Sequence, residues 1–233
     1  MAKIDWNPKN TKIINLGLGL SDWEDPDDPI GHRDTVLHKF FKKSGVPDKN
    51  NLHLRDEKGD YDQLMEILPD FIADSNEDSF LIFYYAGHGG LVEDSELDYD
   101  LEFCHPSENS FTFADLIDII ENNFEGWNVL FIIDCCYSGN IARFASESDS
   151  DYNYAGLTSS MSSETSTGAW TFTDCVLAAL NGKAKIDADK DGDISLKELA
   201  AYIKSQMKEV DNQKSDFGFS ENFDPEMRLA ILK

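Results

Sequence analysis

The sequence of 233 residues predicts an α/β fold in which helices cover both faces of a mostly parallel sheet. Segments typical of strands alternate along the chain with segments of helical periodicity, and this alternation is typical of such folds. The strand segments are near-continuous apolar runs, as expected for strands that are buried on both faces. With 41% hydrophobic and 12% aromatic residues, the chain has enough apolar side chains for one large core. We therefore expect a single domain over residues 1–233.

The strands are predicted from short apolar runs that end at turn residues or at charged residues. The first run contains two glycines, Gly17 and Gly19, and the last is only five residues long. Six such runs give a six-stranded sheet. The expected strands are Lys12–Leu20, Asn51–Arg55, Ser79–Tyr85, Val129–Asp134, Tyr154–Ser159 and Arg228–Leu232.

The helices are predicted from apolar residues spaced three and four apart. In the first of them this spacing is shown by Val36, Leu37, Phe40 and Phe41, and Gly45-Val46-Pro47 ends it. The expected helices are Gly31–Ser44, Asp60–Ala73, Phe111–Asn123, Phe172–Leu180 and a last one that ends near Lys208.

Three polar segments connect these elements. Ser21–Pro29 and Glu93–Ser110 are acidic and irregular, and Arg143–Asp151 is polar and of low complexity. We expect the third segment to be mobile and open to proteolysis, with Arg143 as a suitable target for self-cleavage.

The chain is strongly acidic, with 45 acidic against 20 basic residues and a formal net charge of -25. Such a surface repels nucleic acids and anionic membranes, so neither is expected as a partner. It attracts divalent cations and basic peptides, although the charge is equally explained by solubility alone. No apolar run approaches the ~20 residues of a membrane span.

The compartment is inferred from the N-terminus and the cysteines. Residues 1–10 are polar and lack the apolar core of a signal peptide. The four cysteines show no disulfide-framework spacing and no zinc-type pairing. We therefore expect free thiols in the reducing cytoplasm. A monomer or weak dimer is expected as the oligomeric state.

Two of the strand segments end in glycines and one reactive side chain. Ser79–Gly90 contains His88 after its apolar run, and Asn128–Gly139 contains Cys136 after its own. The two residues are 136 − 88 = 48 positions apart. Parallel strands that end side by side would bring an imidazole and a thiol together, as a thiol nucleophile with its own base requires. A lone histidine or cysteine is more often a loop or core residue, but that explanation leaves the adjacent glycines unexplained.

These two segments closely resemble the catalytic motifs of the caspase-like cysteine peptidases, above all of the bacterial and metacaspase-type branch. The matching stretches are Tyr84–Gly89 and Asp134–Gly139, and the spacing of 48 also fits. The resemblance implies the caspase-like three-layer fold. It makes Cys136 the nucleophile, His88 the general acid or base, and the N–H groups of Gly89 and Cys136 the oxyanion hole. Cys135 falls inside the strand instead. No organic cofactor is implied.

The resemblance also implies a preference for substrates with Arg or Lys before the cut. Asp134 stands where metacaspases carry an acid in the substrate pocket, and Asp34 resembles a second pocket acid. Two carboxylates would hold an Arg side chain through bidentate bonds. Asp34 is equally explained as an acid in the first turn of a helix.

The stretch after the nucleophile resembles the peptide-binding part of these peptidases. By analogy, the strand from Tyr154, taken as an edge strand, and Trp170 bind the substrate in extended form, with Ser159 as a further contact. The alternatives are that Trp170 packs in the core and that Ser159 is only a polar loop residue.

An acidic segment, Asp187–Glu198, matches the twelve-residue calcium loop of EF-hands. Gly192 stands at the sharp turn and Ile194 at the apolar position, and no second, pairing loop is evident. The alternative is an acidic turn that caps the helix starting near Ser195, with Glu198 completing a capping box. The expected calcium ligands are Asp187, Asp189, Asp191, Asp193 through its backbone carbonyl, Ser195 through a water molecule and Glu198 as the bidentate ligand.

Together these features predict a cysteine endopeptidase that cleaves peptides or proteins after basic residues, with calcium and self-processing as further hypotheses. The main alternative is a catalytically silent domain of the same fold that binds calcium and a partner protein. A calcium sensor unrelated to peptidases is disfavoured by the single loop and by the two glycine-flanked motifs.

Overall fold

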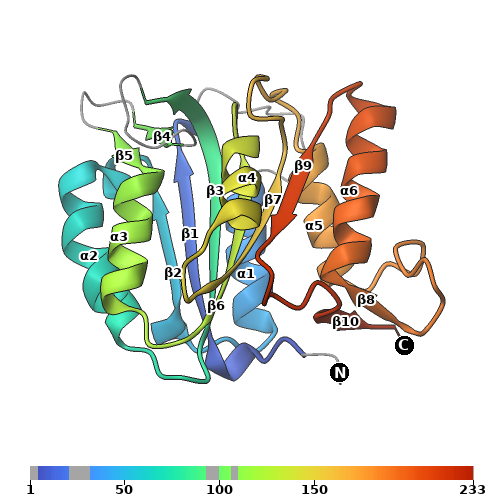
Figure 1. The fold of residues 1–233 in the computed structure, drawn as a ribbon, viewed down its shortest axis with the longest axis horizontal. Coiled ribbons are helices and arrows are strands. Elements are labelled where there is room, and N and C mark those ends of the chain that lie inside the picture. The colour runs from blue at the N-terminus through green and yellow to red at the C-terminus, as the bar shows by residue number, and fades with distance from the viewer. Residues whose placement is uncertain (1–4, 21–31, 93–99, 106–109, 233) are drawn as a thin grey trace.

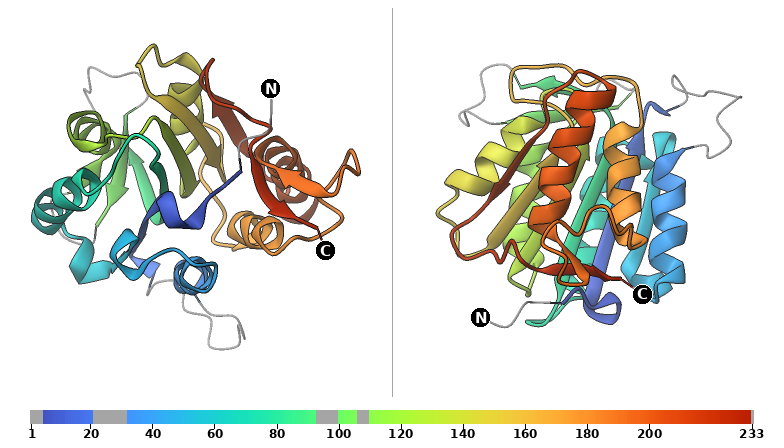
Figure 2. Two further views of the ribbon diagram at one scale, coloured as in Figure 1. Left: turned by 90° about the horizontal axis from the view of Figure 1, so that it is seen from below. Right: turned by 90° about the vertical axis from the view of Figure 1, so that its right-hand side faces the viewer.

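The computed structural model describes residues 5–20, 32–92, 100–105 and 110–232. A central sheet lies between two layers of helices (Figures 1 and 2). The α-helices are α1 (Arg33–Lys43), α2 (Tyr61–Ala73), α3 (Phe113–Asn123), α4 (Gly139–Glu147), α5 (Thr171–Leu180) and α6 (Leu196–Val210). Short 3-10 helices span Pro8–Asn10, Asp48–Asn50 and Asp56–Gly59.

The main sheet contains eight of the strands found in the described residues, and six of them form a continuous path in the order β2-β1-β3-β6-β7-β9. All neighbours along this path are parallel except β7 and β9. Strands β4 and β5 extend the far end of β3 in antiparallel fashion. The bounds are β1 (Thr11–Leu18), β2 (Asn51–Arg55), β3 (Phe80–Leu91), β4 (Leu101–Cys104), β5 (Phe111–Thr112), β6 (Asn128–Asp134), β7 (Asn153–Thr158) and β9 (Asp216–Phe219). A separate two-stranded sheet pairs β8 (Asp193–Ser195) with β10 (Arg228–Ile231).

Each face of the sheet has its own hydrophobic core. One core contains side chains of α1, α5 and α6, and the other contains side chains of α2, α3 and α4. Consecutive residues of a strand point to opposite faces, so Tyr84 belongs to the first core and Phe83 and Tyr85 to the second. Burial on both sides explains why the strand sequences are apolar throughout, and the predicted fold class is confirmed.

Most predicted elements lie within two residues of the observed ones. The second strand has the predicted bounds, and Asp60 caps α2 by accepting a hydrogen bond from the Gln63 N–H at 2.9 Å. The third strand is longer than predicted because β3 continues through Leu91, where it pairs with β4. The first predicted connection, Ser21–Pro29, lies outside the described residues, as do residues 93–99 and 106–109 of the second.

Three expectations about the second half of the chain were wrong. Arg143 lies in helix α4 and forms an ion pair with Glu147, so residues 143–147 are not a mobile loop. The sixth strand of the path is β9, which the sequence did not indicate, whereas the predicted last strand is β10 and pairs with β8. Because β9 covers β7, the strand from Asn153 is not an edge strand and cannot pair along its length with a peptide.

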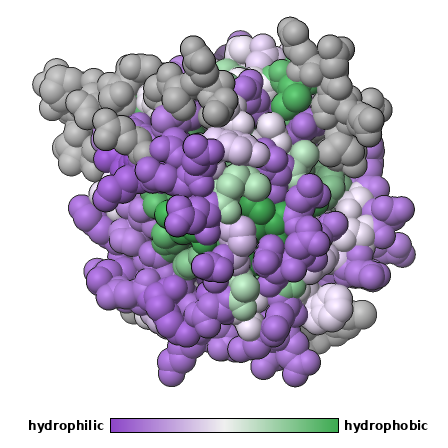
Figure 3. Space-filling model, turned by 90° about the vertical axis from the view of Figure 1, so that its left-hand side faces the viewer, coloured by the Kyte–Doolittle hydropathy of each residue, from purple (hydrophilic) through white to green (hydrophobic). Residues whose placement is uncertain are grey.

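The surface at the left of Figure 1, where α2 and α3 lie, is mostly hydrophilic with small apolar areas (Figure 3). Among the helices of the described residues, none combines the length and the hydrophobicity needed to span a bilayer.

Candidate active site

The two predicted catalytic residues line one cavity at the carboxyl end of the parallel strands. Strands β3 and β6 are parallel neighbours, with Ala86 opposite Asp134, so the residues that follow emerge side by side. The cavity has a volume of about 210 Å³. It is lined by Ala86, Gly87, His88, Asp134, Cys135, Cys136 and the segment Ser166–Trp170.

Cys136 lies in the turn between β6 and α4, and this turn has an unusual backbone. Tyr137 has a φ of 58°, a left-handed conformation that a non-glycine residue seldom adopts. The Tyr137 N–H donates to the Glu164 carbonyl at 2.9 Å. The hydroxyl of Ser160, which is fully buried, accepts from the Ser138 N–H and donates to the Cys135 carbonyl. These contacts fix the turn that presents Cys136.

The structure distinguishes the two adjacent cysteines. Cys135 is 2% exposed, and burial raises the pKa of its thiol well above the ordinary value, so it stays protonated at neutral pH. Cys136 is partly exposed, and its sulfur accepts a hydrogen bond from the Ser166 N–H at 3.3 Å. Cys136 is therefore accessible to a substrate in the cavity, whereas Cys135 is buried. Cys136 is therefore the better nucleophile of the two.

His88 is exposed and lines the cavity, and a buried side chain hydrogen-bonds to its backbone. The hydroxyl of Tyr85, which is fully buried, donates to the His88 carbonyl at 2.6 Å. Gly19 lies beneath the imidazole ring, and a Cβ at this position would be 3.1 Å from the His88 Cδ2 atom. Gly19 also has a φ of 65°, so a side chain there would be strained as well as crowded.

Gly89 lies directly against the nucleophile turn. A Cβ added there would be 2.4 Å from the Cys136 carbonyl oxygen and 2.8 Å from the Cys135 sulfur. Only glycine permits this approach of β3 to the turn, and it brings the backbone predicted for the oxyanion hole next to Cys136.

Asp134 is the acidic residue among the side chains that line the cavity. It is 8% exposed, and its carboxylate accepts a hydrogen bond from the Thr173 hydroxyl at 2.7 Å. Thr173 in turn is bonded to the Tyr84 hydroxyl at 3.0 Å. Burial raises the pKa of Asp134 to about 6, although the hydrogen bonds from Thr173 and Ser159 act in the opposite direction. A cation in the cavity would reverse the effect of burial and keep this carboxyl ionised.

Asp34, the predicted second pocket acid, does not line this cavity. It is fully buried at the start of α1, with its carboxylate 2.7 Å from the His53 Nε2 and 3.1 Å from the Arg55 Nε. Burial alone would raise its pKa, but these two partners outweigh burial and lower it. One oxygen, Oδ2, is paired with these side chains of β2, whereas Oδ1 is buried and has no hydrogen-bond partner among the described residues. Asp134, and not Asp34, is therefore the acid that lines the cavity.

The two remaining predicted substrate contacts differ in position. Trp170 lines the cavity, and its ring lies 5.7 Å from the Arg33 guanidinium, which forms an ion pair with Asp174. Ser159 is fully buried behind the nucleophile turn, where its N–H donates to the Ile133 carbonyl and its hydroxyl contacts the Ser166 hydroxyl. Ser159 therefore supports the site from behind and is not among the lining residues.

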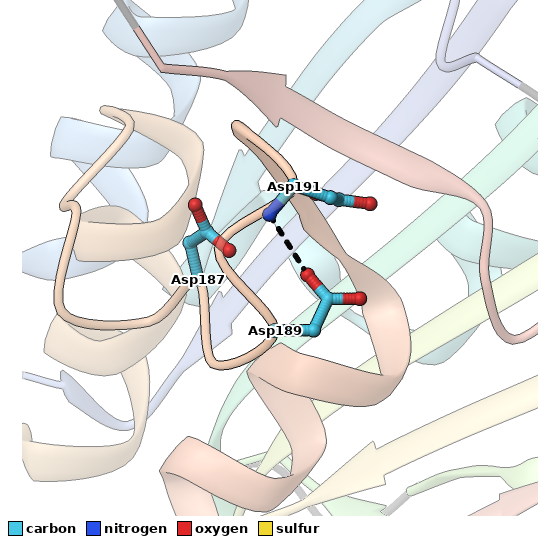
Figure 4. A group of neighbouring side chains, drawn as sticks. All are labelled: Asp187, Asp189 and Asp191. Carbon is cyan, nitrogen blue, oxygen red and sulfur yellow. Dashed lines mark hydrogen bonds between the residues drawn. The ribbon is translucent and has the colours of Figure 1, made fainter.

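The acidic loop brings three of its predicted ligands together. One carboxylate oxygen of each of Asp187, Asp189 and Asp191 lies within 4.8 Å of the other two (Figure 4). The Gly192 N–H donates to Asp187 at 3.2 Å, and Gly192 has a φ of 94°, as a sharp turn requires. The second oxygen of Asp187, Oδ1, is buried and has no hydrogen-bond partner. This donor set fits a hard cation such as Ca²⁺.

The second half of the loop caps α6. Ser195 is the N-cap residue, and Ser195 and Glu198 form a reciprocal capping box, as the alternative interpretation predicted. The other Glu198 oxygen accepts from the Ala188 N–H at 2.7 Å, so the carboxylate also reaches the first half of the loop. The Asp193 carboxylate lies 3.6 Å from Arg228, so it leaves the backbone carbonyl as the expected ligand of this residue.

Within the described residues, the acidic loop pairs with the C-terminal strand and not with a second loop of its kind. Its apolar residue Ile194 is fully buried and lies opposite Ala230 of β10. The Leu232 N–H donates to the Gly192 carbonyl at 2.9 Å. The C-terminal strand thus provides the pairing that a second loop would provide in an EF-hand pair.

The fold and the cavity define an α/β domain that presents a thiol and an imidazole together at the carboxyl edge of its sheet. The family model of the caspase domain matches residues 36–219, and the chain belongs to this family. The fold is also similar to the crystal structure of protein GSU0716 from Geobacter sulfurreducens, with a TM-score of 0.64 and 12% identity over 96% of this chain and 100% of that chain. A comparison with curated protein sequences found no match.

Several residues of the site were not foreseen. Ser166, Thr167 and Ala169 line the cavity from a segment without regular structure, and Thr173 bonds to Asp134 from helix α5. Short polar residues in a loop or in a first helical turn are common, and nothing in their local sequence indicates contact with a distant acid or thiol.

Proposed function

We propose that this protein is a cysteine endopeptidase that hydrolyses peptide bonds after arginine or lysine. The observation that supports this proposal best is one cavity lined by Cys136, His88 and the buried acid Asp134. A thiol, an imidazole and a specificity acid are the parts needed for acyl transfer from a basic peptide.

In the proposed reaction, His88 takes the proton of the Cys136 thiol, and the sulfur attacks the scissile carbonyl carbon. The developing oxyanion is stabilised by backbone N–H groups at Gly89 and Cys136, and His88 protonates the leaving amine. The resulting thioester is then hydrolysed by a water molecule that His88 deprotonates. Release of the carboxylic acid restores the thiol.

The basic preference depends on Asp134. A guanidinium or ammonium group that enters the cavity meets one carboxylate, and the Trp170 ring offers a second contact of the cation–π type. The neighbouring Asp174 is already paired with Arg33, at 2.8 Å between Nε and Oδ1. We therefore expect a weaker selection for Arg over Lys than a pocket with two free acids would give.

A panel of fluorogenic peptides tests this proposal. Peptides with Arg or Lys before the cut should be hydrolysed, and the same peptides with Asp should not. Asp134→Asn should lower kcat/KM for the Arg peptide by about tenfold or more, as expected for the loss of a buried charge partner. Asp118→Asn, which changes an exposed acid of α3 in the same way, is the matched control and should change it little. Preferred cleavage after Asp would contradict the proposed specificity.

We further propose that the acidic loop binds calcium through Asp187, Asp189 and Asp191, with Glu198 completing the site. The proposal is supported by the clustering of three carboxylates and by the buried, unpartnered oxygen of Asp187. Calcium supplies a positive charge that relieves the mutual repulsion of these groups.

Thermal melting with and without calcium tests the metal site separately from activity. One millimolar Ca²⁺ added to chelator-treated protein should raise Tm by several degrees. Binding to the folded state alone adds RT ln(1 + [L]/Kd) to the free energy of unfolding. The rise should be lost in Asp187→Asn and kept in Asp224→Asn, an acidic residue outside the loop. An equal Tm in both conditions would support the helix-capping role alone.

A further inference from the structure

The wall of the cavity that contacts the nucleophile has no regular structure of its own. Residues 161–170 contain no helix and no strand, and Thr165 and Thr167 are exposed. Yet the Ser166 N–H lies 3.3 Å from the Cys136 sulfur, as its hydrogen-bond donor. An irregular, exposed segment holds such a position only if other groups fix it.

One buried side chain, Gln213, holds this segment on both sides of Ser166. Its Oε1 accepts from the Thr167 N–H at 2.8 Å, and its Nε2 donates to the Thr165 carbonyl at 3.1 Å. Gln213 is 7% exposed, and both ends of its amide are used. The amide can satisfy these two partners in one orientation only, since one needs an acceptor and the other a donor.

Gln213 is itself fixed to the end of a helix that is packed in the core. Its N–H donates to the carbonyl of Met207, a residue of α6 that is 1% exposed. The preceding residue, Asn212, has a φ of 52°, which turns the chain back toward the cavity wall. The position of the amide is therefore set by α6 and not by the segment that it holds.

The other anchors of the segment do not replace Gln213. The Glu164 carbonyl accepts from the Tyr137 N–H at 2.9 Å, which fixes the segment before Thr165. The Ser166 hydroxyl contacts the Ser159 hydroxyl at 3.0 Å, but this contact does not direct the Ser166 N–H. Among the hydrogen bonds of the described residues, those of Gln213 hold the peptide groups on either side of Ser166.

We propose that Gln213 is a positioning residue for the reaction of Cys136. Its amide holds residues 165–167 so that the Ser166 N–H donates to the sulfur and favours the thiolate. The proposal rests on the proposed role of Cys136 as the nucleophile. A donor hydrogen bond to the charged form of an acid stabilises that form, so losing it moves reactivity to higher pH.

The test is the rate at which iodoacetamide alkylates Cys136 between pH 5.5 and 9, followed by mass spectrometry of the peptide that contains it. Gln213→Met keeps the length of the side chain and removes both hydrogen bonds. We expect the midpoint of the alkylation rate to move up by about one pH unit, or roughly tenfold in rate at a fixed low pH. The plateau at high pH, which reports access to the thiol, should stay within about twofold.

Two further variants make the result specific. Gln213→Glu keeps the acceptor for the Thr167 N–H, places an oxygen against the Thr165 carbonyl in place of the donor and adds a negative charge to the cavity wall, so its midpoint should move up at least as far as that of Gln213→Met. Gln213→Glu also keeps the proposal testable if Gln213→Met does not fold. Gln206→Met changes a partly exposed glutamine of α6 that bonds to Tyr202 and Lys185, and it should leave the midpoint unchanged.

The proposal is overturned if Gln213→Met and Gln213→Glu keep the wild-type midpoint, or if Gln206→Met shifts it equally. Alkylation needs no substrate, so this outcome is separate from the peptidase proposal. If the protein cleaves no peptide but Gln213→Met still moves the alkylation midpoint, the peptidase proposal is contradicted and the positioning role of Gln213 is supported. In an active protein, Gln213→Met should lower kcat at pH 6.5 more than it raises KM.

Discussion

The buried carboxyl of Asp134 should make the stability of the protein depend on pH in a defined way. Burial raises its pKa from 3.8 to about 6. Because the folded pKa lies above the unfolded value, the folded state binds the extra proton between these two values. The contribution of Asp134 to the free energy of unfolding is therefore greatest at low pH, and it falls as pH rises through the folded pKa of about 6.

The magnitude follows from the size of the shift. A difference of roughly two pKa units corresponds to about 3 kcal/mol over the whole window, at about 1.4 kcal/mol for each unit. Only about 1.4 kcal/mol of this remains between pH 5 and pH 8, because part of the window lies below pH 5. That narrower range is the practical one, since the sequence pI of about 4.3 favours precipitation at lower pH.

The perturbation is Asp134→Asn, which has nearly the same shape and cannot ionise. Urea unfolding of both proteins at pH 5 and pH 8 gives two values of the free-energy difference between them. We expect the variant to gain about 1.4 kcal/mol relative to wild type on going from pH 5 to pH 8. Contributions of other titrating groups cancel in this comparison. A difference that is the same at both pH values would refute the reasoning.

Three other substitutions probe the turn that carries Cys136, the adjacent Gly89 and the buried ion pair of Asp34. Cys135→Ala should lose about 1–2 kcal/mol of stability by urea unfolding and keep the alkylation of Cys136, because Cys135 is a buried thiol. Gly89→Ala should lose about 1–3 kcal/mol and most peptide hydrolysis, because the added Cβ would lie 2.4 Å from the Cys136 carbonyl oxygen. Arg55→Met should destabilise by about 1–3 kcal/mol at pH 7, since Asp34 is fully buried. This last effect should shrink as pH falls through the lowered pKa of Asp34, where its ionised form no longer dominates.

The sequence predicted the strands of the inner sheet well because they are buried on both faces. Apolar runs such as β6 (Asn128–Asp134) have few alternatives to a parallel strand. It failed for β9 (Asp216–Phe219), a four-residue strand at the end of the path with a glycine within it. It failed also for α4, which starts directly after the turn that presents Cys136 and whose polar end has the composition of a loop.

Local motifs were enough to predict the site residues that lie at or just after the ends of strands. The other residues have positions that depend on contacts with distant parts of the chain. His88, Cys136 and Asp134 line one cavity, since parallel strands deliver them to one edge of the sheet. The ion pair of Asp34 was not foreseen, because nothing near it in the sequence indicates Arg55 of β2 as its partner. Gln213 could not be found from the sequence. Its role depends on a turn that follows α6 and on contact with Thr167, which lies 46 residues earlier in the chain.

The central claim is that Cys136, activated beside His88, attacks carbonyl groups that follow a basic residue. Treatment with a peptidyl-Arg chloromethyl ketone, followed by peptide mass spectrometry, tests it most directly. The account predicts a single adduct on Cys136, absent from Cys135, greatly slowed in His88→Ala and not formed by the matching peptidyl-Asp reagent. An adduct on another cysteine, or equal labelling by the Asp reagent, would contradict it.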